Sequence, residues 1–356
     1  MNSPCRFAFL IHPRVALAQD IGDLFWSPLR HLPDRFYETL LRHLPVSPIV
    51  SGQIKIGTVA IGELVTVPLG ARQLLELPRR EVQAKVAQAV NKARAGGATL
   101  VGLGALTAPV TLGGKTLAQR RDIGVTNGNA FTAAMTLMGV ERILSRLEPE
   151  ARVAIVGASG SVGECLVRLM AQRRTTPRLL LVARNMERLE KLANSVCSSS
   201  LQIEVSVDIN SVREADLVVL LTSATDAVLR SEHLKEGAWV LDDTQPRNTD
   251  PALMLERPDV TVVDGGLVEM NEMKMRGTIG LPKGLVYACL AETMLLSLDG
   301  HTEHYSIGNP TLEQAAHMLT LAHKYREYGF GLAPFRSFGK LLEQTPSLIV
   351  RTLQVA

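Results

Sequence analysis

Short, almost wholly apolar runs recur along the chain from residue 151 onward. In order they are RVAIVG (152–157), RLLLVAR (178–184), LQIEVSV (201–207), ADLVVLLTS (215–223), AWVLDD (238–243) and VTVVDGG (260–266). Helix-like segments separate the first three runs. Continuous apolar strands that alternate with helices are typical of a parallel sheet, because both faces of such a strand are covered. The pattern therefore predicts a doubly wound α/β domain.

The first 150 residues have a different pattern of apolar and polar segments. The segment 80–97 predicts an amphipathic helix that ends at a Gly-Gly pair, and the apolar run 98–106 predicts a buried strand after it. We also expect a strand at 7–11, a strand or hairpin at 58–67 and a helix at 126–147. The rest of the first 50 residues, with repeated prolines, is expected to be irregular. These elements indicate a separate N-terminal α/β domain.

After residue 266 the chain returns to helical patterns. We therefore expect three segments along the chain. They are an N-terminal α/β substrate domain at 1–150, the doubly wound domain at 151–270 and a C-terminal helical segment at 271–356.

Composition and charge argue against several classes of protein. Hydrophobic residues make up 46% of the 356 residues and charged residues 21%, which is an ordinary globular composition. The net charge of +3 comes without a dense run of Lys and Arg, so we expect no nucleic-acid partner. The four cysteines form no C-x-x-C pair and no cluster of metal ligands stands out, so we expect no metal.

The sequence predicts no targeting segment and no transmembrane segment. The apolar run at 7–11 is interrupted by His12 and Pro13, and is shorter than the roughly 7–15 apolar residues of a signal sequence. No uninterrupted apolar stretch is long enough to span a bilayer. Few cysteines in a long chain fit a reducing compartment, so we expect a cytoplasmic protein.

The clearest chemical signal is VAIVGASGSVGECLVRLM (153–170), in which a strand ends in a glycine-rich turn and a helix begins. Gly157 permits the tight turn, Gly160 lets the backbone approach a pyrophosphate, and Gly163 lets helix and strand pack closely. The N-terminus of the helix favours a phosphate. A second strand follows about 20 residues later, so the spacing predicts a dinucleotide-binding (Rossmann) domain. The candidate contacts in the turn are Gly157, Ala158, Ser159, Gly160, Val162 and Gly163.

The end of the second strand selects the cofactor. NAD sites usually place Asp or Glu there to bind the ribose hydroxyls, whereas this chain has Arg184, with Arg188 one helical turn later. Because a guanidinium suits a 2′-phosphate, we expect NADPH. The alternative is that Arg184 is a surface residue without a ligand. The other candidates for the cofactor site are Ala183, Asn185, Thr222 and Ser223.

If a nicotinamide cofactor binds, one cysteine becomes a candidate for catalysis. Cys289 lies in GLVYACLAETMLL (284–296), which we interpret as one apolar helix. It is either a buried thiol that packs as a small hydrophobe, or a nucleophile that attacks a thioester. In the second case, hydride transfer to the thioacyl group gives an aldehyde. That role needs a lowered thiol pKa, for which a helix start after Pro282 and the charge of Lys283 are candidates.

Two further residues near this cysteine are candidates. Glu292 lies three residues after Cys289, on the same helix face, where it either tunes the thiol or holds the helix to a neighbour. His301, in HTEH (301–304), is a candidate proton donor, although exposed loop histidines are the commoner case.

With these residues in view, the chain resembles the long-chain acyl-[acyl-carrier-protein] reductases, which make fatty aldehydes. The likeness is clearest in TNGNAFTA (126–133), VAIVGASGSVG (153–163), LVARNMERLEKL (181–192), DDTQPRN (242–248), GGLVE (265–269) and YACLAETMLL (287–296). The resemblance implies that Cys289 is the nucleophile that takes the acyl group, and that Glu292 matches the family's glutamate. It also implies that Gly128 and Asn129 line the active cleft.

The chain departs from the family pattern in three segments. The family's D-G-G-Y-P-K-N is DDTQPRN here, and its G-W-H-T is GHT (300–302), which displaces His301 by one position. The segment 266–284 also differs in detail. These departures leave the acyl length and the thioester carrier open more than the reaction.

The lead hypothesis is an NADPH-dependent reductase of fatty acyl thioesters, carried by acyl carrier protein or coenzyme A, with a ping-pong mechanism through thioacyl-Cys289. We expect a hydrophobic tunnel for the acyl tail between the N-terminal and dinucleotide domains. A hydrophobic aldehyde product is compatible with peripheral membrane contact and with a partner enzyme that consumes the aldehyde, although no sequence segment points to either.

Three alternatives stay open. A shikimate-dehydrogenase-like oxidoreductase would transfer hydride directly, but the sequence shows no convincing Lys–Asp pair for it. A glutamyl-tRNA-reductase-like enzyme would need a nucleophile in the N-terminal domain, where only Cys5 is present. A non-catalytic module that senses NADP would keep Cys289 as a structural thiol.

Overall fold

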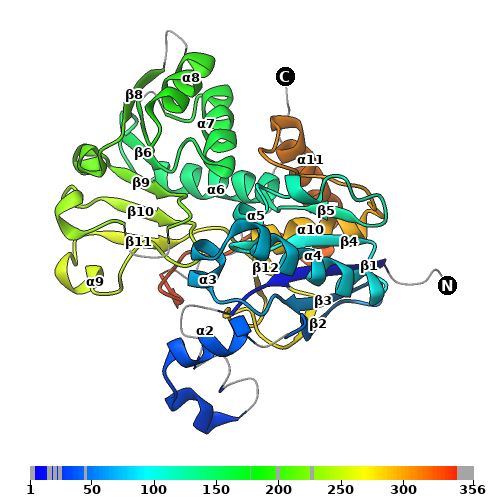
Figure 1. The fold of residues 1–356 in the computed structure, drawn as a ribbon. Helices are drawn as coiled ribbons and strands as arrows, with labels where there is room; N and C mark the ends of the chain where they lie inside the picture. Colours follow the sequence, from blue (N-terminus) through cyan, green and yellow to red (C-terminus); the bar gives the residue numbers. More distant parts are fainter. Residues whose placement is uncertain are drawn as a thin grey trace. The chain divides into compact units, whose positions relative to one another are not determined.

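A computed structural model describes residues 5–13, 18, 22, 26–43, 46–176, 178–197, 201–224 and 228–342, and the chain divides into two compact units (Figure 1). The first unit comprises Met1–Gly128, Glu272–Gly280 and Thr293–Gly308. The second comprises Asn129–Asn271, Leu281–Glu292 and Asn309–Ala356. Whereas the three predicted segments are continuous, each unit takes in parts of the last of them.

The first unit is built on a six-stranded sheet. Its strands lie in the order β13 (Met273–Arg276), β2 (Ile49–Ile56), β3 (Ala60–Thr66), β1 (Cys5–Ile11), β4 (Leu100–Leu103) and β5 (Gly124–Thr126). β1 runs parallel to β3 and β4, whereas β2 runs antiparallel to β3 and β13. The strand expected at 7–11 is therefore confirmed, and the segment 58–67 forms the second arm of a hairpin.

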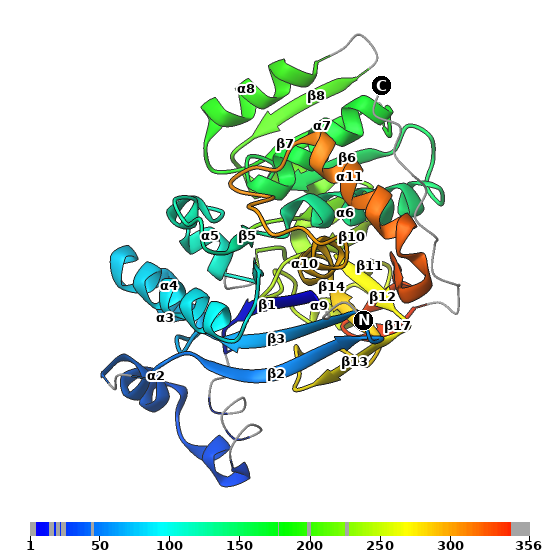
Figure 2. The same ribbon diagram turned by 90° about the vertical axis from the view of Figure 1, so that its right-hand side faces the viewer.

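Helices of the first unit cover this sheet. α4 (Arg79–Ala95) packs against β1 and β3 (Figure 2). It confirms the predicted amphipathic helix, and its buried residues are Val82, Val86, Ala89, Val90 and Ala93. The short helices are α3 (Ala71–Glu76), α5 (Thr107–Val110) and η2 (Lys115–Leu117). The prediction that the first 50 residues are otherwise irregular is wrong, because they also contain η1 (Ser27–His31) and α2 (Asp34–His43).

The second unit contains the predicted doubly wound sheet. Its six parallel strands lie in the order β11 (Thr261–Asp264), β10 (Trp239–Asp242), β9 (Leu217–Leu220), β6 (Arg152–Val156), β7 (Arg178–Val182) and β8 (Gln202–Ser206). Counted along the chain from β6, this is the order 3-2-1-4-5-6 of the Rossmann fold. The predicted fold class, an α/β protein with a doubly wound parallel sheet, is confirmed.

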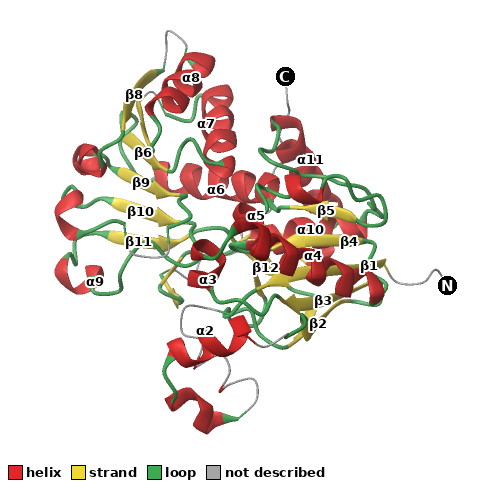
Figure 3. Cartoon of the chain, in the orientation of Figure 1, coloured by secondary structure: helices red, strands yellow, loops and turns green. Residues whose placement is uncertain are grey.

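Helices and a small sheet complete the second unit (Figure 3). The helices are α6 (Asn129–Leu144), α7 (Ser161–Arg173), α8 (Met186–Val196), η3 (Ile209–Glu214), η4 (Ser231–His233), α9 (Leu253–Glu256), α11 (Leu312–Lys324) and η5 (Arg326–Tyr328). The small antiparallel sheet has the order β14 (Leu285–Tyr287), β12 (Leu267–Met270) and β15 (Gly329–Leu332), and a two-stranded ribbon joins β16 (Arg336–Ser337) to β17 (Lys340–Leu341).

The segment that carries Cys289 differs from its prediction. Residues 284–296 were expected to be one helix, but residues 285–287 form β14 and pair with β12, so the helix α10 (Ala288–Leu298) begins later. A short apolar run fits a strand as well as a helix, and here pairing with a distant strand decides. Cys289 is therefore the second residue of α10.

No helix among the described residues is long and apolar enough to cross a membrane.

The centre of the parallel sheet should dominate the stability of the second unit. Ile155 lies in β6, between β7 and β9, and is fully buried. Replacing it by alanine leaves a cavity, so Ile155→Ala should lower the free energy of unfolding by about 2–5 kcal/mol in chemical denaturation. Leu255→Ala, at a side chain that is 87% exposed, is the control and should change it by less than about 0.5 kcal/mol. Equal losses in the two variants would contradict this view of the core.

Candidate active site

The glycine turn joins β6 to α7 and requires glycine at two positions. Gly157 has a φ of 93°, and its N–H donates to the carbonyl oxygen of Val182 at 2.8 Å. A side chain on Gly163 would bring its Cβ within 2.4 Å of the Gly157 carbonyl oxygen. The helix and the turn could not pack this closely with any other residue there. The backbone therefore has the form that a dinucleotide-binding turn needs.

The N-terminus of α7 presents amide groups where a pyrophosphate would lie. Gly160 is the N-cap residue, and without a side chain it cannot itself cap the first turn. Nδ2 of Asn129 donates to Oγ of Ser161 at 2.8 Å, so the start of α6 is fixed to the start of α7. The other turn residues predicted to contact the cofactor are Ala158, which is buried, and the half-buried Ser159 and Val162.

The end of β7 carries the predicted cofactor-selecting arginine. Arg184 and Arg188 are both exposed. Asn185 lies between them, and its Oδ1 accepts the N–H of Arg188 at 2.9 Å as the N-cap of α8. Ala183 continues the sheet through a bond from its N–H to the carbonyl oxygen of Ser206 at 3.2 Å. Asn185 thus orders the loop, and the two guanidinium groups remain available to a phosphate.

The end of β9 approaches the same turn. A Cβ on Gly157 would come within 3.1 Å of the backbone nitrogen of Thr222. The hydroxyl of Thr222 donates to Oδ1 of Asn248, and it accepts the N–H of Ala224 at 3.2 Å. Ser223 is exposed. β6 and β9 are the strands at which the strand order reverses, which is where open α/β sheets bind their ligands.

These groups fit a dinucleotide with a 2′-phosphate. The tight glycine turn, the helix N-terminus and an arginine at the end of the second strand are the parts that such a site needs. NADPH is the cofactor for which the site is built. Gly157, Gly160 and Gly163 would hold its pyrophosphate, and Arg184 its 2′-phosphate.

Cys289 lies in the first turn of α10. The N–H of Ala288 donates to the carbonyl oxygen of Gly266 at 2.8 Å, which fixes the helix start against the turn between β11 and β12. Cys289 as a whole residue is partly exposed, whereas its sulfur lies inside the protein. By contrast, Cys165 is buried within α7, as a thiol that packs as a small hydrophobe would be.

The electrostatic environment of Cys289 opposes ionisation. Burial of the sulfur raises the pKa of the Cys289 thiol to about 12, and the carboxylates of Asp243 and Glu292 add to this increase. Hydrogen bonds from the backbone N–H groups of Leu290 and Cys289 itself act in the opposite direction. The expected lowering of the thiol pKa is therefore wrong for the free chain. Lys283 is exposed, and the charged groups that act most on the thiol are carboxylates.

Glu292 ties two helices together. Its side chain is fully buried, and Oε2 accepts the backbone N–H of Phe131 at 2.8 Å. Phe131 lies in the first turn of α6, whose amide groups have no partner within the helix, so the carboxylate acts as a cap from another element. Of the two roles open to Glu292, the contact supports the one that holds α10 to a neighbour.

His301 and Gly128 belong to the first unit, whereas Cys289 belongs to the second. Nε2 of His301 is buried and has no hydrogen-bond partner among the described residues, and the ring packs edge-on against Tyr305 at 5.4 Å between centroids. Gly128 has a φ of 77° and immediately precedes α6. The proton-donor role of His301 and the cleft role of Gly128 and Asn129 stay predictions.

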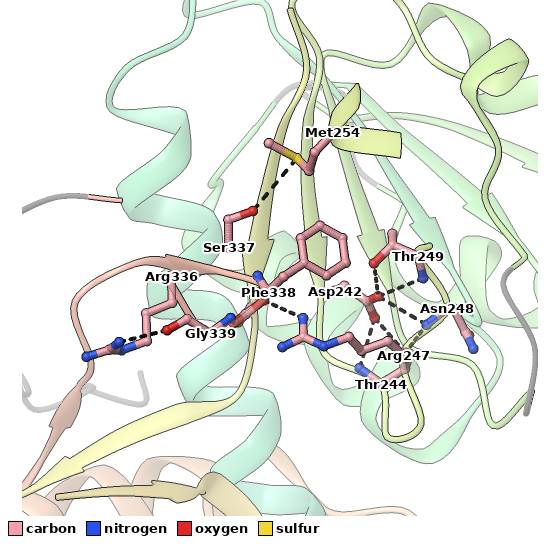
Figure 4. Close-up of polar contacts among 11 residues, drawn as sticks. Asp242, Thr244, Arg247, Asn248, Thr249, Met254, Arg336, Ser337, Phe338 and Gly339 are labelled. Carbon is pink, nitrogen blue, oxygen red and sulfur yellow. Dashed lines mark hydrogen bonds and ion pairs between the residues drawn. The ribbon is translucent and has the colours of Figure 1, made fainter. Parts of the chain in front are cut away.

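The sequence did not predict how the loop after β10 is held. The buried carboxylate of Asp242 accepts five hydrogen bonds. They come from the N–H and hydroxyl of Thr244, the N–H of Asn248, and the N–H and hydroxyl of Thr249, at 2.5–3.2 Å. Figure 4 shows these groups converging on the carboxylate. One charged side chain thus fixes the whole loop.

A second contact closes this loop against the C-terminal ribbon. Arg247 pairs with Asp264 at the end of β11. The Arg247 guanidinium lies 5.2 Å from the ring centre of Phe338, and Figure 4 shows these two side chains close together. The same Asp264 carboxylate accepts the N–H groups of Phe338 at 2.9 Å and Gly339 at 2.7 Å. The ribbon therefore packs on the loop that precedes the candidate site.

Asp243 was missed as a candidate residue. It follows Asp242 directly, and its Oδ2 accepts the hydroxyl of Thr136 on α6. Burial raises the pKa of Asp243 to about 7, the charge of Asp242 adds to the increase, and the Thr136 hydrogen bond opposes it. The available signal was the second aspartate of DDTQPRN, at the position where the resembling family segment has glycine.

A small pocket lies within the second unit beside these residues. Thr136, Asp264, Gly265 and Gly266 form part of its lining. The rest is mostly apolar and consists of Met135, Gly139, Leu241, Leu267, Leu332, Ala333 and Phe335. The expected tunnel for an acyl tail between the two domains stays a prediction.

Among the residues that the structure describes, no group of three or more His, Cys, Asp or Glu side chains could hold a metal ion.

Comparison with known proteins supports an oxidoreductase class. A family model described as shikimate / quinate 5-dehydrogenase matches residues 140–265, which contain the whole parallel sheet of the second unit. The chain is 26% identical to aminotransferase PigE of Serratia sp. (strain ATCC 39006) over 352 residues, 95% of this chain and 41% of that protein. It is 29% identical to the long-chain acyl-[acyl-carrier-protein] reductase of Synechococcus elongatus over 193 residues, 51% of this chain and 54% of that protein.

The chain thus spans about half the length, or less, of these two curated relatives. Among solved structures, the Δ(1)-pyrroline-2-carboxylate reductase of Thermococcus litoralis aligns with a TM-score of 0.28 and 17% identity, over 34% of this chain and 38% of that one. The quinone oxidoreductase of Thermus thermophilus aligns with the same TM-score and identity, over 38% of this chain and 42% of that one. With the strand order and the glycine turn, the sequence matches place the chain among NAD(P)-dependent oxidoreductase-like proteins.

Arg184 should select NADPH over NADH. Charge-assisted hydrogen bonds contribute about 1.5–3 kcal/mol, so Arg184→Gln should raise the Kd for NADPH by about 10–150-fold and leave the Kd for NADH nearly unchanged. Titration of cofactor fluorescence would measure both constants. Arg178→Gln, at the exposed opposite end of β7, is the matched control and should change neither. If Arg184→Gln raises the Kd values for NADPH and NADH equally, the guanidinium does not bind the 2′-phosphate.

Glu292 should act as a cap on α6. Glu292→Ala leaves the buried N–H of Phe131 without this acceptor, so the free energy of unfolding should fall by about 1–3 kcal/mol. Glu292→Gln keeps an oxygen that can accept this N–H, so its free energy of unfolding should fall by less than that of Glu292→Ala. Thermal or chemical denaturation of the two variants, measured side by side, tests this. If the glutamine variant is the less stable of the two, the capping role is wrong.

Proposed function

We propose that this chain is an NADPH-dependent acyl-thioester reductase that releases an aldehyde, with Cys289 as its nucleophile. The observation that carries the proposal is the place of Cys289: it is partly exposed, in the first turn of a helix, in the same unit as the cofactor turn. The match to the Synechococcus elongatus reductase at 29% identity supports the acyl-thioester substrate. Acyl carrier protein or coenzyme A would be the carrier.

Cys289 would carry out the first half of the reaction. Its sulfur attacks the carbonyl carbon of the thioester, a new carbon–sulfur bond forms, and the bond to the pantetheine sulfur breaks. The carrier then leaves as its free thiol. The positive end of the α10 dipole and the amide groups of its first turn favour the negative charge that develops at this place.

The second half would return the enzyme to its starting state. Gly157, Gly160, Gly163 and Arg184 hold and orient the cofactor. NADPH, when bound, supplies the hydride that reduces the acyl carbon. The carbon–sulfur bond to Cys289 then breaks, the aldehyde leaves, and the Cys289 sulfur takes a proton. Because the carrier thiol leaves before reduction, the kinetics should be ping-pong.

A second candidate is a shikimate-dehydrogenase-like oxidoreductase that transfers hydride directly to a small carbonyl substrate. The family-model match favours it, but that match covers residues 140–265 and leaves out most of the first unit and Cys289. The match therefore supports the cofactor half of the protein and says little about the substrate.

The experiment that separates the two candidates is intact-protein mass spectrometry. The chain is mixed with a panel of acyl-CoA and acyl-carrier-protein thioesters without NADPH. We expect a mass gain equal to the acyl group, lost as an aldehyde when NADPH is added. Cys289→Ala should abolish the gain, whereas Cys197→Ala, at an exposed thiol, should keep it.

No adduct with any thioester would refute the thioester reductase. Hydride transfer to small carbonyl substrates, with Cys289→Ala as active as the parent chain, would then support the second candidate.

A further inference from the structure

Asp243 is held in a fixed place on the turn between β11 and β12. A Cβ on Gly266 would lie 2.1 Å from Oδ1 of Asp243, and one on Gly265 would lie 2.8 Å from its Cβ. On the other side, Oδ2 accepts the hydroxyl of Thr136 from α6. The carboxyl group thus packs directly on two glycines and is oriented by one hydroxyl. No side chain larger than hydrogen fits at Gly265 or Gly266 while Asp243 stays where it is.

The same turn fixes the start of α10. The carbonyl oxygen of Gly266 accepts the N–H of Ala288 at 2.8 Å, and Cys289 is the next residue. Asp243 packs on Gly266, and the residue before Cys289 is hydrogen-bonded to Gly266, so Asp243 and Cys289 lie at the same turn. Of the charged groups that act on the Cys289 thiol, the Asp243 carboxylate is the one with the largest effect. Because both groups lie at this turn, Asp243 is a candidate to exchange a proton with the sulfur.

The two groups have protonation states that suit such an exchange. With a pKa of about 12, the Cys289 thiol keeps its proton at neutral pH. With a pKa of about 7, the Asp243 carboxyl group is partly ionised there. A general base works best when its pKa lies near the working pH, because it can then both take and return a proton.

The neighbouring charges do not supply a competing base. Asp242 accepts five hydrogen bonds, and Asp264 is paired with Arg247. Glu292 accepts the N–H of Phe131. From α6, Arg142 stacks on the Phe335 ring at 4.5 Å, on the lining of the pocket beside Thr136.

We propose that Asp243 is the general base and acid for the thiol of Cys289. Its carboxylate takes the S–H proton as the sulfur bonds to the acyl carbon. The resulting carboxylic acid gives that proton to the pantetheine sulfur as the old carbon–sulfur bond breaks. The acylation half-reaction then balances without another acid. This inference rests on the proposed thioester reductase activity, and it assigns a role to the aspartate that replaces a glycine of the resembling family segment.

The test compares two reactions of the same sulfur in Asp243→Asn. Acylation by an acyl-CoA, followed by mass spectrometry without NADPH, should rise with pH through about 7 in the parent chain, because the ionised carboxylate is the active form. In Asp243→Asn the acylation rate should fall by about 10²–10⁴-fold and lose this rise. Alkylation of Cys289 by iodoacetamide needs only the thiolate. It should become faster at pH 8, because the loss of a neighbouring negative charge lowers the thiol pKa.

The opposite directions of the two rates separate the proposed role from an electrostatic or a structural one. If both rates rise, Asp243 only repels the thiolate; if both fall, it only maintains the structure. Either result overturns the proposal. An acyl adduct in the parent chain with an unchanged pH profile in Asp243→Asn also overturns it and leaves the reductase standing. The absence of any adduct in the parent chain removes the reductase and this inference together.

A second variant keeps the carboxyl group in place. Thr136→Val removes the hydrogen bond that lowers the pKa of Asp243, so the rise in acylation should move to higher pH while the plateau rate is largely retained. Thr320→Val, at an exposed threonine whose hydroxyl donates to the carbonyl oxygen of Ala316, is the control and should leave the profile unchanged. A profile that does not move in Thr136→Val contradicts the assignment.

Discussion

One buried carboxylate determines much of the geometry of the candidate site. Oε2 of Glu292 accepts the N–H of Phe131, which ties the first turn of α6 to α10. A fully buried charge is stable only where it is paired or hydrogen-bonded, so this contact leaves little freedom to either helix. Because α6 also carries Asn129, which reaches the helix of the glycine turn, and Thr136, which orients Asp243, the cofactor turn and the thiol depend on the same helix start.

The electrostatics of the site follow from the carboxyl groups that lie near Cys289. Asp243 and Glu292 both raise the pKa of the Cys289 thiol, and the backbone hydrogen bonds at the start of α10 do not outweigh them together with burial. A nucleophile in such surroundings rests as a neutral thiol and needs a base during the reaction. In the proposed reaction, these surroundings would keep the sulfur unreactive at rest and link its activation to the protonation state of a neighbour.

The structure shows which contacts the two aspartates of DDTQPRN make, where the chain departs from the pattern of the family that it resembles. Asp242 holds the loop through five hydrogen bonds, and Asp243 projects onto Gly265 and Gly266, where only hydrogens leave room for a carboxyl group. In the sequence this segment reads only as a loss of glycines and an aromatic residue. Its chemical meaning depends on Thr136, which lies 107 residues away along the chain.

The sequence by itself determined the parallel sheet, the glycine turn and the arginine at the end of the second strand. Those features are local, because apolar runs, glycine spacing and the residue after a strand need no distant partner to be recognised. Tertiary structure decided the start of α10, the cap that Glu292 makes on a residue 161 positions away, and the environment of Cys289. Pairing of β14 with β12 chose strand over helix for residues 285–287, and burial among carboxylates set the pKa of the thiol. Both depend on groups that come together only when the chain folds.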